Sequence, residues 1–185
     1  MRHVRREEIL PLEVYERSRD EIRRGMMEAK APRRIHAGPL TFLFENTATA
    51  RYQIQEMVRA EKMIREADIA HELETYNELL GGPGELGATL LIELTDPVER
   101  DLKLRAWLGL PDRLYVKLAD GRKVRAAFDA RQVGDDRVSS VQYLKFAVGG
   151  EAPVAIGADL PALTVEAALS PEQREALRQD LAAAP

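Results

Sequence analysis

Residues 40–94, LTFLFENTATARYQIQEMVRAEKMIREADIAHELETYNELLGGPGELGATLLIEL, contain the pattern that decides the fold. Segments 40–45 and 88–94 are apolar at almost every position, as is typical of strands buried on both faces. Between them, the spacing of apolar residues predicts two helices, at about 47–66 and 67–80, and the glycine-rich GGPGELG turn ends the second. We therefore expect strand, helix, helix, turn and strand.

This stretch also contains a candidate polar site. On the helical wheel Glu61 falls between Met57 and Ile54, inside the apolar face, and a buried carboxylate needs a partner such as an arginine, a tyrosine hydroxyl or a metal. A structural ion pair and simple exposure are the alternatives. Glu45 ends the first strand and Glu93 interrupts the second, so the two carboxylates would lie close together if those strands pair. The candidate polar site comprises Glu45, Glu61, Glu93, Tyr76 and Asn77.

A weaker pattern concerns metal binding. His71, Glu74 and Glu78 share the face of the second helix opposite its apolar stripe, and carboxylates with an imidazole are ligands for divalent metals. Glu56 of the first helix is a further candidate ligand. No second copy of the pattern occurs, so a solvated helix face is the favoured interpretation and a site of Glu56, His71 and Glu74 is the alternative.

Before this stretch, residues 7–29 predict a largely helical segment, and residues 34–46 predict two short strands joined by a Gly-Pro turn. A basic turn lies between them. Arg33, Arg34 and His36 are candidates for binding a phosphate or a carboxylate. A solvated helix face followed by a basic turn is the favoured interpretation, and the anion site is the alternative.

After residues 40–94, the pattern of residues 113–148 predicts strands around an Asp-Gly hairpin turn. The segment PVAIGAD at 153–159 predicts a short edge strand. Residues 171–184 predict a final helix that begins with Ser-Pro. Helices alternate with strands early and hairpins dominate late. This order predicts a single α+β domain over 1–185, a mostly antiparallel sheet with packed helices and the central helical hairpin of 40–94.

Composition excludes several classes of protein. Among 185 residues there is no cysteine, so disulfides, thiol catalysis and any cysteine-ligated cofactor are excluded within this chain. No apolar run reaches the roughly 20 residues of a membrane span, and the N-terminal segment lacks the apolar core of a secretory signal. The net charge of −4 argues against nucleic-acid binding. We expect a cytoplasmic protein without membrane contact.

Five blocks of sequence carry a resemblance: ILPLEVYERSRDEIR, RRIHAGPLTFLFEN, QIQEMVRAEK, HELETYNELLGGPGELGATLLIEL and SVQYLKFAV. Together they resemble an uncharacterised bacterial family catalogued as domain of unknown function 3501, in order and over most of the chain. The resemblance implies no activity and no catalytic residue. It implies a context, because such proteins are often encoded beside rubrerythrin-like proteins and cysteine-rich iron–sulfur oxidoreductases.

Three functions follow as hypotheses. The first is an accessory protein of a rubrerythrin or iron–sulfur redox or peroxide-stress system, which would bind an acidic partner such as a rubrerythrin-like protein through a basic sheet face. The second is a metal-binding protein or metal-dependent enzyme with a carboxylate-rich site, and the third is a small anion-binding protein. A homo-oligomer is compatible with each, and the cofactor and catalytic residues are open. The basic face comprises Lys117, Arg122, Lys123 and Arg125, for which a merely solvated face is the favoured interpretation.

Overall fold

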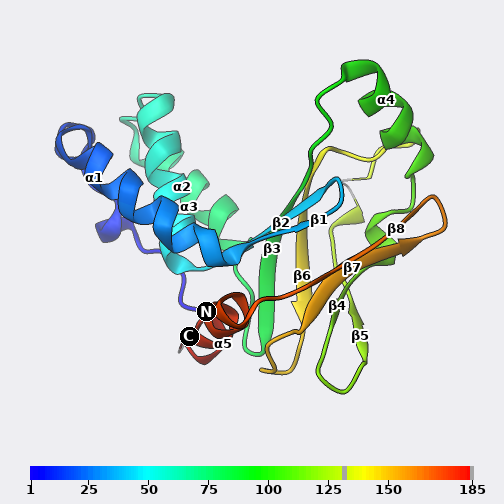
Figure 1. Ribbon diagram of the computed structural model, residues 1–185. Helices are drawn as coiled ribbons and strands as arrows, with labels where there is room; N and C mark the ends of the chain where they lie inside the picture. The colour runs from blue at the N-terminus through cyan, green and yellow to red at the C-terminus, as the bar shows by residue number, and fades with distance from the viewer. Residues whose placement is uncertain (131–132, 184–185) are drawn as a thin grey trace.

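A computed structural model of the chain describes residues 1–130 and 133–183. Figure 1 shows the first three helices gathered on one side of the molecule, beside two sheets that lie face to face. The helices of the described chain are α1 (Leu12–Lys30), α2 (Thr47–Ala60), α3 (Glu66–Asn77), α4 (Pro97–Ala106) and α5 (Pro171–Ala182). None of them is long and apolar enough to cross a membrane.

The helix-side sheet has the strand order β1-β2-β3-β6, with every neighbouring pair antiparallel. Its side chains alternate between two faces, as in any strand. In β2, for example, Phe42 and Phe44 point into the interior, whereas Leu43 and Glu45 point toward the helices. The strands are β1 (Arg34–Ala37), β2 (Leu40–Glu45), β3 (Glu85–Ile92) and β6 (Val141–Ala147).

The outer sheet has the strand order β5-β4-β7-β8, also antiparallel. The sequence predicts a short edge strand at 153–159, and this segment contains β7. Its predicted place at the edge is wrong, because β7 pairs with β4 on one side and with β8 on the other. The sequence pattern also missed β8, whose LTVEAA segment is only half buried on one face. The strands are β4 (Leu114–Lys117), β5 (Lys123–Arg125), β7 (Ala155–Leu160) and β8 (Leu163–Ala168).

The main hydrophobic core lies between the two sheets. Interior side chains of the helix-side sheet, such as Phe42, Leu90 and Phe146, pack there with Val116 and Ile156 of the outer sheet. A second, smaller core joins η1 (Arg6–Glu8) and the residues around it to α2 and α3. The mixed α+β class is therefore confirmed, with the difference that the strands form two sheets where one was expected. The predicted C-terminal helix is α5, and its expected last residue, Ala184, lies outside the described residues.

Local capping sets the bounds of α2. Asn46 is the N-cap, and its side chain accepts a hydrogen bond from the Thr49 amide, so the helix begins at Thr47 as expected. The helix ends six residues earlier than expected, at Ala60. Lys62 has a positive φ of 51°, which reverses the chain before α3.

A glycine fixes the distance between α3 and the helix-side sheet. Gly87 of β3 faces the loop that follows α3, and a Cβ there would lie 1.9 Å from the Leu79 carbonyl oxygen and 3.2 Å from the Gly81 nitrogen. Only glycine permits this approach of one backbone to another. The glycine-rich segment therefore brings the end of α3 directly against the sheet and closes one end of the space between them.

Candidate functional site

The space between the helices and the face of the helix-side sheet that is turned toward them contains two adjoining cavities. Strand register aligns Leu43, Thr89 and Tyr143 in one row across β2, β3 and β6. We call the smaller cavity, of about 210 Å³, the recess, and the larger one, of about 590 Å³, the main cavity. Tyr76, Leu79 and Tyr143 line both, so they form the boundary between the two.

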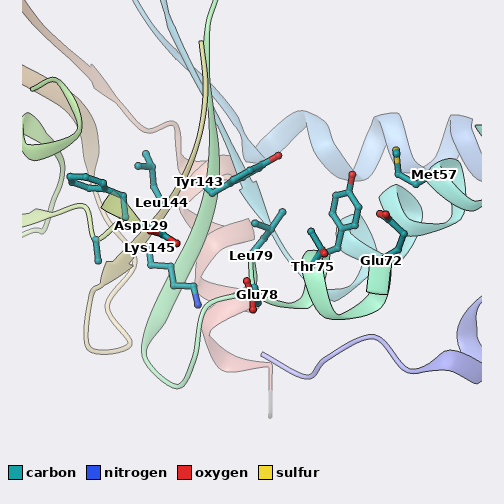
Figure 2. A pocket seen from close by; sticks show the side chains of 12 residues that line it. Met57, Glu72, Thr75, Glu78, Leu79, Asp129, Tyr143, Leu144 and Lys145 are labelled. Atoms are coloured by element: carbon teal, nitrogen blue, oxygen red, sulfur yellow. The ribbon is translucent and has the colours of Figure 1, made fainter. Parts of the chain in front are cut away.

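The main cavity is lined mostly by apolar side chains from α2, α3, β6 and the segment before residue 130. An isolated antiparallel β-bridge between Ala127 and Lys145 holds that segment against β6. Phe128, the next residue, forms part of the cavity wall. Figure 2 shows Tyr143 extending from β6 toward the helices, with Leu79 below it and Thr75 facing it from α3. The apolar lining residues are Met57, Tyr76, Leu79, Ala127, Phe128, Tyr143 and Leu144. The polar and charged residues Glu72, Thr75, Glu78, Asp129 and Lys145 complete the lining.

The recess is more polar, and Glu45 lies in its wall. One carboxylate oxygen accepts a hydrogen bond of 2.6 Å from the Thr49 hydroxyl, and the other accepts one of 2.9 Å from the Thr89 hydroxyl. Glu45 is only 9% exposed. These two hydroxyl groups compensate the burial of the carboxylate and connect the start of α2 to β3.

Lys30, the last residue of α1, contributes a cation to the recess. Its ammonium lies 5.1 Å from the centre of the Tyr52 ring, within the range of a cation–π interaction. Burial lowers the pKa of Lys30, the Glu45 carboxylate opposes that shift, and Arg34 adds to it. No ion pair joins Lys30 to a carboxylate in the described chain.

Tyr76 is half-buried between the recess and the main cavity. Burial raises the pKa of its hydroxyl, and a hydrogen bond with the Gln53 side chain opposes that shift. The phenol therefore stays neutral at physiological pH and offers both a donor and an acceptor. With Glu45, Lys30 and Gln53, Tyr76 gives the recess a carboxylate, an ammonium, an amide and a hydroxyl within one small volume.

Two of the predicted site glutamates lie elsewhere. Glu61 is the C-cap of α2 and is exposed, so its predicted place on the buried face is wrong, because the helix ends before that turn is complete. Glu93 follows β3 at the end of the sheet remote from Glu45. Strands β2 and β3 are antiparallel, so Glu45 pairs with Gly87 while Glu93 lies beyond the Leu40 pairing. The three carboxylates do not converge.

Asn77 lies next to Tyr76 in sequence but has a structural role. Its side chain accepts a hydrogen bond from the Val4 amide at 2.8 Å and donates one to the Val4 carbonyl at 2.9 Å. Both backbone groups of Val4 are thus satisfied. Asn77 fixes the N-terminal segment against α3 and is not part of the recess.

The candidate anion site is divided between two ion pairs. Arg33 donates two hydrogen bonds, of 2.7 and 2.9 Å, to the Asp180 carboxylate of α5. Arg34 pairs with Glu93 at 2.8 Å, and His36 Nδ1 lies 3.9 Å from the same carboxylate. The two arginines are therefore paired with the protein's own acids, and the three predicted residues do not form a common site.

The alternative metal site of Glu56, His71 and Glu74 is not assembled, and the exposure of His71 and Glu74 agrees with the favoured solvated face. Glu56 accepts hydrogen bonds from the Tyr15 hydroxyl at 2.5 Å and from the Arg19 guanidinium at 2.8 and 2.9 Å. His71 and Glu74 are exposed on α3. Within residues 1–130 and 133–183, no group of three or more histidine, aspartate or glutamate side chains is placed to hold a metal ion.

The basic face on the outer sheet exists, but its cations are paired. Lys117 contacts Glu166 at 2.9 Å, and Arg125 and Lys123 share Asp159 at 2.7 and 3.0 Å. Arg122 lies 3.5 Å from Asp120. These carboxylates offset most of the positive charge that a docking surface would use. The association with an acidic redox partner stays a prediction.

Sequence reasoning found Glu45 and Tyr76 but missed Lys30 and Tyr143. Lys30 ends a helix whose direction relative to the sheet is a tertiary property, so no local pattern marks it. Tyr143 carried a usable signal: in the alternation of β6 it is out of phase with the buried Leu144, which assigns it to the opposite face.

Comparisons with known proteins agree on the fold. A model of the family described as "Protein of unknown function (DUF3501)" matches residues 3–181. A crystal structure of a novel protein of unknown function from Burkholderia pseudomallei K96243 is similar, with 30% sequence identity and a TM-score of 0.89, covering 97% of this chain and 100% of that chain. No curated protein matches. The resemblance stated from the sequence is confirmed, and the link to rubrerythrin-like proteins stays a prediction.

Proposed function

The chain belongs to the DUF3501 family, and we propose that it is a small-molecule-binding protein whose ligand occupies the main cavity and the recess. One observation carries this proposal: a largely apolar cavity of about 590 Å³ adjoins a small polar recess at the contact of two layers. Ligand sites have typical volumes of roughly 300–1,000 Å³ and combine apolar walls with a few convergent polar groups.

The walls of this site come from elements that are joined to one another by contacts within the protein. Glu45 connects α2 to β3 through Thr49 and Thr89, and Gly87 seats the end of α3 on the sheet. Because these contacts do not depend on a ligand, the cavity is preformed. A preformed site avoids part of the ordering cost of binding, so even a small ligand can bind usefully.

Binding to the main cavity can be tested with indole, a neutral aromatic probe, by saturation-transfer NMR. Thr75 is exposed on α3 and lines the cavity, so Thr75→Trp should fill it without disturbing the core. His71, one turn earlier on the same helix, is also exposed and does not line it. His71→Trp is therefore the matched control.

We expect indole to bind the wild type and the His71→Trp variant equally. Thr75→Trp should weaken binding by about tenfold or more, because the introduced ring occupies the apolar volume that indole would fill. Equal affinity for all three proteins would contradict the proposal, since the main cavity would then have no part in binding.

A further inference from the structure

The recess contains two opposite charges that do not pair with each other. Glu45 is anchored by two threonine hydroxyls, and the Lys30 ammonium lies over the Tyr52 ring. Both side chains line the same cavity of about 210 Å³. No direct ion pair joins Lys30 to Glu45, and the two charges interact only at longer range. Each therefore keeps capacity for a further direct partner in the recess.

This arrangement discriminates between classes of ligand by charge. A simple carboxylate would be attracted by Lys30 but repelled by Glu45, and a simple amine would meet the reverse. Either ligand would also leave one of the two partly buried charges without a direct partner, which is unfavourable away from bulk water. A head group with one positive and one negative charge satisfies both side chains at once.

We infer that the ligand is a zwitterion with a bulky apolar substituent, of which an α-amino acid with a large side chain is the simplest example. Its carboxylate would lie next to Lys30 and its ammonium next to Glu45. This inference rests on the proposed function, because it assigns the recess and the main cavity to the same ligand.

The dimensions of the two cavities agree with this assignment. The recess accommodates a compact polar head and offers the Gln53 amide and the Tyr76 hydroxyl as additional hydrogen-bonding groups. The main cavity is larger and begins at the same two tyrosines, Tyr76 and Tyr143. An aromatic or branched aliphatic side chain attached to the head would extend between these rings toward Phe128.

Three ligands with the same phenyl ring test the inference: L-phenylalanine, 3-phenylpropanoate, which lacks the ammonium, and 2-phenylethylamine, which lacks the carboxylate. Dissociation constants are measured by NMR titration with wild-type protein. L-Phenylalanine should bind at least about tenfold more tightly than either analogue, because hydrogen bonds between charged groups are among the stronger ones.

Two variants assign the charges. Lys30→Met should abolish the preference for L-phenylalanine over 2-phenylethylamine, and Glu45→Gln should abolish its preference over 3-phenylpropanoate. The ligand series on the wild type gives an answer even if Glu45→Gln weakens the fold, since Glu45 also connects α2 to β3.

The outcomes separate the two proposals. If L-phenylalanine binds no better than an analogue, or does not bind, while indole still distinguishes Thr75→Trp from His71→Trp, the zwitterion inference is overturned and the proposed function stands. If indole also fails to distinguish those variants, the proposed function falls as well. A preference for L-phenylalanine that Lys30→Met removes supports both.

Discussion

Replacing Gly87 with alanine adds one methyl group at the point where the end of α3 meets the sheet. The new Cβ would lie 1.9 Å from the Leu79 carbonyl oxygen. Carbon–oxygen contacts lie at about 3.3 Å or more, so the loop must retreat by roughly 1.4 Å. The Leu79 oxygen is a backbone atom and the position of Cβ is set by the backbone, so a change of rotamer cannot relieve the clash.

Overpacking of a dense interior costs about 1–3 kcal/mol, and a clash between backbones belongs at the upper end of that range. For a domain of this size, about 3 kcal/mol corresponds to a decrease in Tm of roughly 6–12 °C. The same movement displaces Leu79, which lines both cavities, so the affinity for indole should fall as well.

Gly25→Ala is the matched control, because it makes the same chemical change with the opposite expectation. Gly25 lies within α1, and a Cβ there would have no neighbour within 4 Å. Alanine should stabilise this helix by about 0.5–1 kcal/mol. Urea denaturation of both variants measures the difference. A Gly87→Ala protein as stable as the wild type would refute the close approach of α3 to the sheet.

Two further predictions concern ion pairs that stabilise the fold. Asp180→Ala should cost about 3–5 kcal/mol in urea denaturation, because Arg33, with a side chain only 11% exposed, would lose its carboxylate partner and keep only the Ala29 carbonyl. The double variant Arg33→Met with Asp180→Leu should recover most of that loss. An Asp180→Ala variant with wild-type stability would contradict the ion pair. The hydrogen bonds from Arg2 lower the pKa of Glu8 from its ordinary 4.5 to about 2. The stabilisation is therefore complete above about pH 4.5 and is lost as the pH falls toward 2; Glu8→Gln should flatten the stability profile in that window, and an unchanged slope would contradict it.

The sequence predicted most of the elements because their signals are local. Residues 40–94 fold as strand, helix, helix, turn and strand, since apolar spacing and the glycine-rich turn need no knowledge of distant residues. Strand β8 was not predicted because its sequence has no continuous apolar run. The division into two sheets also escaped prediction, because strand partners are chosen by contacts across the whole chain.

The candidate site was only partly predictable for the same reason. Glu45 and Tyr76 both lie within residues 40–94, on β2 and α3, so reasoning about one stretch could bring them together. The prediction that Glu61 is buried failed because the last turn of α2 decides between burial and exposure of this side chain. The prediction that Glu93 lies near Glu45 failed because β2 and β3 are antiparallel, so their C-terminal residues lie at opposite ends of the sheet. Lys30 reaches the recess only through the packing of α1.

The most direct test of the central claim, that a small molecule binds between α3 and the helix-side sheet, is an NMR titration of isotopically labelled protein with L-phenylalanine. Chemical-shift changes in backbone amides should cluster at residues 43–45, 75–79, 89–91 and 141–145, where β2, α3, β3 and β6 surround the two cavities. Changes that cluster on the outer sheet, or that are absent at saturating ligand concentrations, would contradict it.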